Sequence, residues 1–222
     1  MEISLIQKKV LDFFGKTSLR EVFYWTGGTL LAEIYLHHRK SSDLDFFSEK
    51  PFNYNDVVKF VEHLKKELNL KKVEEKKIFD RREFFLHNKE KLRIEFVLYQ
   101  YPALLPRKKY NNIFIDSLDD IAANKTMAFF DRNDPKDLYD IYFLITKKSY
   151  SPEKLLKMVK KKFGVTFSES SFWSESFKDF KELDNLKPLI TLKNLGEKSE
   201  LIKQIREYFS NKSVNYLNRK LR

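Results

Sequence analysis

The spacing of apolar residues changes once along this chain, near residue 117, and that change limits the folds the chain can adopt. Before it, short runs of aromatic and β-branched residues are interspersed with helical patterns, whereas after it the apolar residues recur at helical spacing. Strands followed by a helical stretch are typical of an α+β fold. We therefore expect a core domain over residues 1–116 and a helical C-terminal region, packed on that core, over residues 117–222.

The first half contains several short runs rich in strand-forming residues and separated by turn residues. The last three long runs predict an antiparallel meander, with Asn88-Lys89-Glu90 as one of its turns. The strands are predicted at residues 22–25, 43–47, 73–79, 83–87, 92–99 and 112–115.

Helix starts are marked by capping residues and prolines. Thr29 is a suitable N-cap for a helix over residues 30–36, and Ser117-Leu118-Asp119-Asp120 resembles a capping box that opens a helix through Phe130. Pro135 and Pro152 stand where a first helical turn tolerates proline. Further helices are predicted at residues 3–14, 55–68, 138–145, 152–163, 167–180 and 198–209.

Composition excludes several classes of protein. A hydrophobic content of 42% is enough for a packed core, and no apolar run approaches the roughly 18 residues of a membrane span. The amphipathic start of the chain is unlike a secretory signal, so we expect a cytoplasmic protein with no membrane partner. The chain has no cysteine, which excludes thiolate metal sites. Its net charge of +11 favours a polyanionic partner such as nucleic acid or a nucleotide, although a basic surface also serves solubility.

Two acidic residues, Asp43 and Asp45, alternate with Leu44 and Phe46 in a predicted strand. Residues two apart in a strand project from the same face, so the two carboxylates lie side by side and repel unless solvated or bridged by a cation. Hard oxygen ligands suit Mg²⁺. Glu95, flanked by apolar residues, is a candidate third ligand. A solvated surface strand is the alternative explanation for the acidic pair.

The turn Gly27-Gly28 follows one predicted strand and precedes a helix. Two glycines let the backbone approach a ligand closely, and the N–H groups at a helix start suit phosphate. The turn lacks the spacing of a Walker loop and the third glycine of a dinucleotide fingerprint. The alternative to phosphate binding is that Gly27 and Gly28 only form a tight turn.

Two multi-residue patterns occur in the region 20–147. The first comprises Gly27-Gly28-Thr29 and His38-Arg39-x-Ser41-x-Asp43-Leu44-Asp45-Phe46-Phe47. The second comprises Ser117-Leu118-Asp119-Asp120-Ile121-Ala122, Lys125, Arg132 and Lys136-Asp137-Leu138-Tyr139-Asp140-Ile141-Tyr142. Together they resemble the AbiEii/AbiGii-type nucleotidyltransferases, toxins of type IV toxin–antitoxin systems within the polymerase-β-like superfamily. The sequence departs from the family pattern in having Glu95 where members often have Asp, and Lys136 where an Arg is usual.

The resemblance implies a nucleotidyltransferase-type mixed β-sheet flanked by helices and an enzyme that moves a nucleoside monophosphate from an NTP to an acceptor hydroxyl. It implies Mg²⁺ or Mn²⁺ as cofactor, an RNA acceptor such as tRNA, and a cognate antitoxin as partner. The implied roles are metal binding for Asp43, Asp45 and Glu95, catalysis for Asp43, Asp45, Lys125 and Asp140, and nucleotide binding for Gly27, Gly28, Thr29, Arg39 and Ser41.

Two other functions stay open at this point. One is a catalytically inactive nucleotide- or partner-binding protein of the same fold, and the other is a two-metal nuclease, because paired acids also serve hydrolysis. Intact Asp43 and Asp45 weigh against the first, and the Gly-Gly-Thr turn weighs against the second because a nuclease needs no phosphate cradle there.

Overall fold

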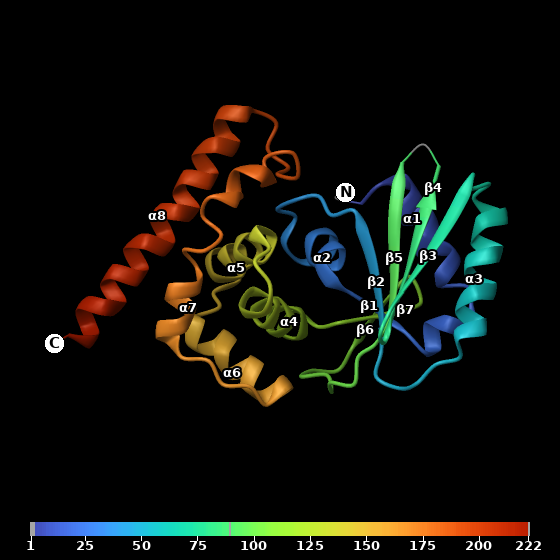
Figure 1. Ribbon diagram of the computed structural model, residues 1–222, viewed down its shortest axis with the longest axis horizontal. Helices are drawn as coiled ribbons and strands as arrows, with labels where there is room; N and C mark the ends of the chain where they lie inside the picture. Colours follow the sequence, from blue (N-terminus) through green and yellow to red (C-terminus); the bar gives the residue numbers. More distant parts are fainter. Residues whose placement is uncertain (1–2, 89, 222) are drawn as a thin grey trace. The chain divides into compact units, whose positions relative to one another are not determined.

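The computed structural model describes residues 3–88 and 90–221, and the chain divides into two compact units, Met1–Ile121 and Ala122–Arg222 (Figure 1). Among the described residues, the first unit contains all the strands and the second is helical. The α+β architecture expected from the sequence is confirmed. The predicted boundary between residues 116 and 117 precedes helix α4 (Leu118–Asp131), whereas the division of the structure falls inside this helix.

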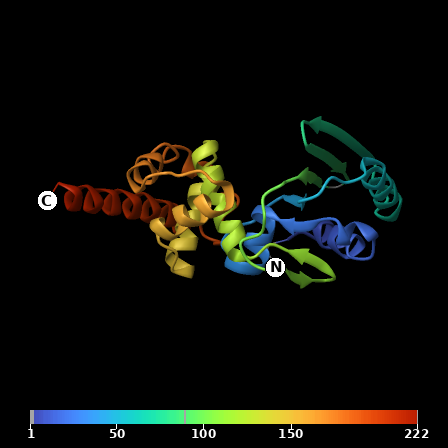
Figure 2. The ribbon, with the colours of Figure 1, turned by 90° about the horizontal axis from the view of Figure 1, so that it is seen from below.

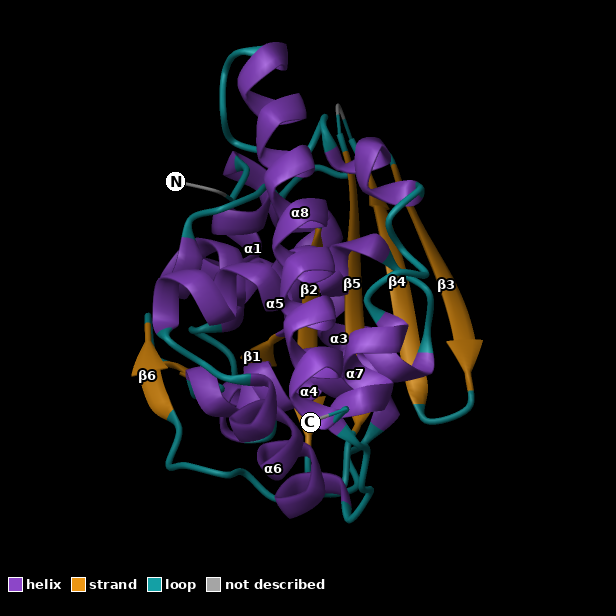
Figure 3. Ribbon diagram, turned by 90° about the vertical axis from the view of Figure 1, so that its left-hand side faces the viewer, coloured by secondary structure: helices purple, strands orange, loops and turns teal. Residues whose placement is uncertain are grey.

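Seven strands of the described chain form one mixed sheet, in the order β3-β4-β5-β2-β1-β7-β6. Figure 3 shows the run from β3 through β5 and β2 to β1. Strand β2 lies parallel to β5 and antiparallel to β1, and β1 lies parallel to β7. The strands are β1 (Tyr24–Thr26), β2 (Asp43–Ser48), β3 (Lys72–Ile78), β4 (Arg81–His87), β5 (Lys91–Leu98), β6 (Lys108–Tyr110) and β7 (Ile113–Ile115).

The predicted meander is confirmed, since β3, β4 and β5 pair antiparallel in sequence order. Of the turn predicted at Asn88-Lys89-Glu90, Lys89 lies outside the described residues. The short edge strand β6 was missed because Lys108-Lys109-Tyr110 carries no apolar alternation and is defined only by its pairing with β7.

One face of the sheet is buried under two helices, α1 (Leu5–Phe14) and α3 (Tyr54–Glu67). Phe14 of α1 stacks on Phe46 of β2 with ring centroids 4.1 Å apart, and Phe60 of α3 meets Phe96 of β5 at 6.0 Å. Phe14, Phe46 and Phe96 are each 0% exposed. Because side chains alternate along a strand, this aromatic core turns the residues before and after Phe46 to the opposite face.

Helix α2 (Gly27–Leu30) starts directly at the double glycine, not after it. Its N-cap position is Thr26, so the prediction of Thr29 as N-cap was wrong. The hydroxyl of Thr29 instead donates to the backbone carbonyl of Asp43, which ties α2 to β2. The helix then widens into the π-helical segment η2 (Leu31–Leu36), and π-helical turns inside helices often accompany functional sites.

The second unit consists of helices in its described part (Figure 2). Ser117 caps α4 as predicted, donating to and accepting from Asp120. The last helix is much longer than the predicted 198–209, because its buried face continues beyond Phe209 through Ser213 and Tyr216. The helices are α4, α5 (Pro135–Lys148), α6 (Pro152–Phe163), α7 (Glu169–Glu175), the short 3₁₀ segment η3 (Glu182–Leu186) and α8 (Leu195–Lys220).

None of the helices within residues 3–88 and 90–221 combines the length and the apolar character that a membrane span requires.

We predict that Phe14→Ala lowers the free energy of unfolding by about 3–5 kcal/mol, because it leaves a cavity beside Phe46 in the aromatic core. Phe79→Ala is the matched control, since Phe79 is 93% exposed and the same change there should stay within about 0.5 kcal/mol. Urea unfolding of both variants measures the difference. Equal losses for the two variants would contradict this description of the core.

Candidate active site

The face of the sheet opposite the aromatic core carries the acidic residues singled out in the sequence. In the parallel pairing of β2 with β5, Asp43 stands beside Arg93 and Asp45 beside Glu95, and all four point to the same face. Glu95 is 4% exposed, so it does not lie on a wet face as an isolated strand glutamate usually would. Asp43 and Asp45 themselves are partly exposed, so the burial is strongest at Glu95.

Two arginines, which the sequence analysis did not assign to the site, pair with these carboxylates and offset part of their charge. Arg93 donates from Nη2 to Asp43 Oδ2 at 2.9 Å and from Nη1 to Glu83 Oε1 at 3.1 Å. Arg81 Nε lies 2.6 Å from Glu95 Oε1. The sequence could have predicted the place of Arg93, because Arg93 precedes Glu95 by two residues in the same strand and therefore lies on the same face.

The electrostatics of this face centre on Glu95. Burial and the neighbouring charge of Asp45 raise the pKa of Glu95 to about 7, against the opposing effect of Arg81 and Arg93. The carboxylates in turn outweigh burial and raise the pKa of Arg93. The cluster thus holds more negative than positive charge in a partly buried place, a condition that favours binding of an additional cation.

The Gly-Gly turn lies directly against this carboxylate cluster. Gly27 has φ +80°, and a Cβ there would lie 1.9 Å from Asp45 Oδ2. At Gly28, a Cβ would lie 2.9 Å from Arg39 Nη2 and 3.2 Å from Ser41 Oγ. The structure thus brings Gly27, Gly28, Arg39, Ser41 and Asp45 together, as the sequence patterns predicted, and Arg39 is 2% exposed.

The donor chemistry at this face fits a divalent metal ion, because Asp43, Asp45 and Glu95 are hard oxygen ligands on adjacent strands. Among the described residues, however, no group of three acidic or histidine side chains is already arranged to hold a metal ion. The guanidinium of Arg93 explains this, since its Nη2 lies 2.9 Å from Asp43 Oδ2 and 3.9 Å from Glu95 Oε2. A metal bound here would share these carboxylates with Arg93.

A second charged cluster lies in the C-terminal unit, between α4 and α5. Lys125 Nζ is 2.8 Å from Asp137 Oδ1 and 2.8 Å from Asp140 Oδ2, and both aspartates are 0% exposed. Arg132 Nε also donates to Asp137 Oδ2 at 2.8 Å. Burial opposes the ionised form of Asp137, but Lys125 and Arg132 outweigh it and lower its pKa.

The structure brings together Lys125 and Asp140, which the resemblance assigned to catalysis, and adds Asp137 as a third member of the cluster. The carboxylate cluster of β2 and β5 and the cluster around Lys125 belong to different units.

The fold, a mixed sheet with a glycine turn packed against an acidic pair on the next strand, is that of the nucleotidyltransferases. Two solved structures share it. A candidate nucleotidyltransferase from Helicobacter pylori superposes with a TM-score of 0.61 at 18% identity, covering 95% of this chain and 94% of that one. JHP933 from Helicobacter pylori superposes with a TM-score of 0.60 at 18% identity, covering 98% and 95%.

The family follows from the sequence comparisons. The family model described as nucleotidyl transferase AbiEii toxin, type IV TA system, matches residues 10–212, and the chain belongs to this family of nucleotidyltransferases. An uncharacterized protein of Aquifex aeolicus strain VF5, aq_aa25, is 31% identical over 167 residues, which cover 73% of this chain and 77% of that protein. The resemblance recognised from the motifs is confirmed.

We predict that Glu95 titrates near pH 7 in the metal-free protein and that Asp45→Asn lowers its pKa by removing a neighbouring negative charge. Carboxyl-carbon NMR measures both values, with Asp56→Asn on the exposed side of α3 as control. Because the pKa of the folded state lies above the ordinary value of 4.5, the folded protein binds the extra proton. The contribution of Glu95 to stability should therefore fall as the pH rises from 4.5 to about 7. An unchanged Glu95 pKa in Asp45→Asn would contradict the coupling.

We predict that Lys125→Met destabilises the protein by about 3–5 kcal/mol, because it leaves buried Asp137 and Asp140 without a cation that both contact. Lys157→Met is the control, since Lys157 forms an exposed pair with Glu153 that contributes at most about 0.5 kcal/mol. Thermal and urea unfolding compare the two. A loss as small as that of the control would show that the buried cluster does not depend on Lys125.

Proposed function

We propose that the protein transfers a nucleoside monophosphate from an NTP to a hydroxyl of an RNA acceptor such as tRNA, in a Mg²⁺- or Mn²⁺-dependent reaction, as the toxin of a pair with a cognate antitoxin. Membership of the family indicates the nucleotidyltransferase activity and the class of toxin. The observation that carries the finer proposal is the packing of Gly27 directly on Asp45, because it joins a phosphate-binding turn and an acidic pair into one site.

Asp43, Asp45 and Glu95 are the proposed metal ligands. When bound, the metal would neutralise charge on the phosphoryl group during transfer. Asp45 and Glu95 offer it oxygens from adjacent strands, and a bound cation would oppose the effect of burial and of Asp45 that raises the pKa of Glu95. Arg93 pairs with Asp43 and with Glu83 and thereby limits the repulsion among the carboxylates when no metal is bound.

The phosphates of the NTP are assigned to the turn and its neighbours. Gly27 and Gly28 present backbone N–H groups at the start of α2, where the helix dipole favours an anion. Arg39 and Ser41 border the same turn and add a guanidinium and a hydroxyl. The hydroxyl of Thr29 is engaged by Asp43, which supports a positioning role for it in holding β2 against the turn.

Lys125 is the proposed second cation for the triphosphate, and Asp140 is proposed to orient it. The ion pair of 2.8 Å between them supports this assignment. A lysine held by two buried aspartates keeps its proton and a fixed position, which is what charge stabilisation of a phosphate requires.

We predict that the purified protein labels RNA when incubated with labelled NTPs, Mg²⁺ and total RNA, and that Asp45→Asn abolishes labelling while the protein stays folded. The asparagine keeps the shape of the side chain and removes the charge that a metal needs. Shortened RNA would indicate a nuclease instead, and unchanged RNA a binding protein. Labelling that survives in Asp45→Asn would overturn the assignment of the site.

Gly27→Ala and Gly164→Ala form a matched pair for the same assay. Both glycines have positive φ, +80° and +73°, so alanine strains both, but only at Gly27 does a Cβ meet Asp45. We expect Gly27→Ala to lose at least about 100-fold in labelling, because a displaced carboxylate no longer fits the reacting groups. Gly164→Ala should keep its activity.

A further inference from the structure

The turn between β3 and β4 exposes a large aromatic side chain at the end of the sheet. Ile78 pairs with Arg81, so Phe79 and Asp80 form a two-residue hairpin loop. Figure 3 shows β3 and β4 joined at one end of the sheet. Phe79 is 93% exposed, the largest exposed fraction among the large hydrophobic residues of the described chain. Its ring therefore contributes almost nothing to the packing of its own unit.

The backbone of Phe79 is also unfavourable for an aromatic residue. Its φ is +47°, in the left-handed region that a bulky side chain rarely adopts. The first position of a two-residue hairpin loop with positive φ commonly holds glycine or asparagine. Neither packing nor turn geometry thus explains why an aromatic residue stands at this position. The combination of exposure and backbone strain points to a partner that covers the ring.

The charges beside Phe79 indicate that this partner is a polyanion. Lys76 and Lys77 are exposed at the end of β3, and neither forms an ion pair with another described residue. Arg81 directly follows the loop and keeps 46% of its side chain exposed. Residues 76–82 contain four basic side chains and one acidic side chain. Cations around an exposed aromatic ring are typical of single-stranded nucleic-acid binding, in which the cations contact phosphates and the ring stacks on a base.

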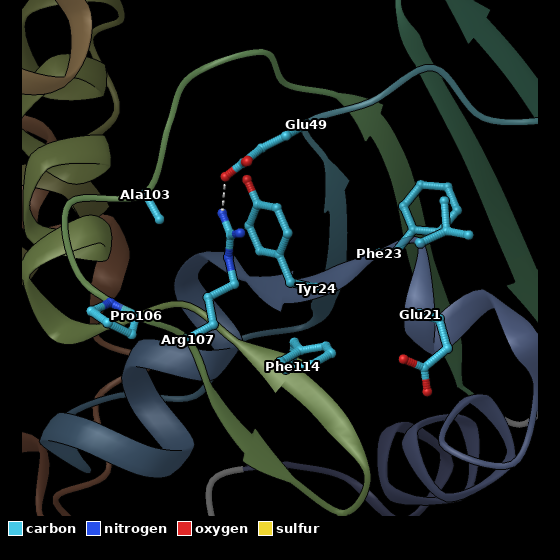
Figure 4. Close-up of a pocket in the computed structure, with 9 residues that line it drawn as sticks. Glu21, Phe23, Tyr24, Glu49, Ala103, Pro106, Arg107 and Phe114 are labelled. Carbon is cyan, nitrogen blue, oxygen red and sulfur yellow. Dashed lines mark hydrogen bonds and ion pairs between the residues drawn. The ribbon is translucent and has the colours of Figure 1, made fainter.

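A cavity at the beginning of β1 is less suitable for a nucleic-acid backbone. Its volume is about 390 Å³, and its lining includes Tyr24, Glu49 and Arg107 (Figure 4). Arg107 is already paired with Glu49 Oε1 at 2.6 Å and with Asp116 Oδ1 at 3.1 Å. A phosphate in this cavity would face two carboxylates beside one cation. The exposed lysines of β3 therefore make the β3–β4 hairpin the better place for an RNA backbone.

The β3–β4 hairpin is also connected to the carboxylate cluster. Arg81 lies two residues after Phe79, so their Cα atoms are at most about 7 Å apart. Arg81 Nε lies 2.6 Å from Glu95 Oε1. A base stacked on Phe79 therefore belongs to a strand that can reach the proposed metal ligands within a short length.

We propose that the β3–β4 hairpin is a docking element for single-stranded RNA, in which Phe79 stacks on an unpaired base and Lys76 and Lys77 contact neighbouring phosphates. Stacking tolerates any base, so the hairpin adds affinity without a sequence preference. A double helix keeps its bases stacked on one another and does not offer them to Phe79. Docking needs neither metal nor NTP. Only the identity of this RNA as the acceptor rests on the proposed function.

Fluorescence anisotropy of a labelled single-stranded RNA of about twelve nucleotides, titrated with the whole metal-free protein, tests the stacking. Phe79→Ala should weaken binding at least about 5-fold, the effect of losing one stacked base. Phe79→Trp should keep the affinity, because indole also stacks. Phe79→Leu should lose nearly as much as Phe79→Ala, because leucine is apolar but cannot stack. Wild-type affinity in Phe79→Ala or in Phe79→Leu would overturn the proposal.

The salt dependence of the same titration tests the phosphate contacts. Combining Lys76→Ala with Lys77→Ala should make the plot of log affinity against log salt shallower by about 1.4, because each phosphate contact on a single strand contributes about 0.7. Lys8→Ala with Lys9→Ala on α1 is the charge-matched control and should keep the wild-type slope. Equal slopes in the two double variants would overturn the assignment of the phosphate contacts.

Stability measurements separate docking from folding. Phe79→Asn places a residue that tolerates positive φ in the loop, so its Tm should not fall, whereas its RNA affinity should fall as in Phe79→Ala. Leu5→Ala is the matched control for loss of an exposed apolar side chain, since Leu5 is 71% exposed in the same unit, and it should leave RNA binding unchanged. Equal weakening of RNA binding by Leu5→Ala would overturn the specific role of Phe79.

The RNA-labelling assay separates this proposal from the proposed function. Phe79→Ala should raise the KM for RNA and leave kcat unchanged, because the ring contributes to binding and touches none of the reacting groups. Binding of single-stranded RNA through Phe79 without any labelling would refute the proposed function and leave the docking element standing. Labelling with an unchanged KM and affinity in Phe79→Ala would refute the docking element alone and indicate a protein partner for the ring.

Discussion

The site depends on one close approach, that of the Gly27 backbone to the Asp45 carboxylate. A Cβ at Gly27 would lie 1.9 Å from Asp45 Oδ2, so the two strands and the turn reach this arrangement only because the side chain is absent. The positive φ of Gly27 gives glycine a second advantage there. The hydroxyl of Thr29 then fixes α2 to the backbone of β2, and the turn and the acidic strand become a single structural unit.

Buried charge is the second constraint, and each unit balances it in its own way. On the sheet, Arg81 and Arg93 offset Asp43, Glu83 and Glu95, yet the pKa of Glu95 stays raised at about 7. In the helical unit, Lys125 and Arg132 pair closely with their aspartates, and the pKa of Asp137 is lowered instead. That cluster is electrostatically satisfied and fixes the position of its lysine.

Local patterns anticipated most of the elements, because α1, α3 and the meander follow hydrophobic periods that their burial preserves. Local patterns did not predict the features that depend on contacts between residues far apart in the sequence. Thr29 was predicted to be an N-cap, but its hydroxyl donates a hydrogen bond to the backbone carbonyl of Asp43. Strand β6 exists through its pairing with β7, and Arg93 enters the carboxylate cluster through the register of β2 with β5. Helix α8 extends beyond the predicted 198–209 because Ser213 and Tyr216 continue its buried face.

The sequence by itself determined the family, the α+β order of elements and the residue types of the site, since motif spacing and side-chain alternation are local properties. Only the tertiary structure decided that Glu95 lies beside Asp45, that Arg93 stands between the carboxylates, and that Tyr24, Glu49 and Arg107 surround a cavity. These facts depend on strand register and on contacts between residues far apart in the chain. No pattern along the sequence encodes such contacts directly, because they arise when the sheet assembles.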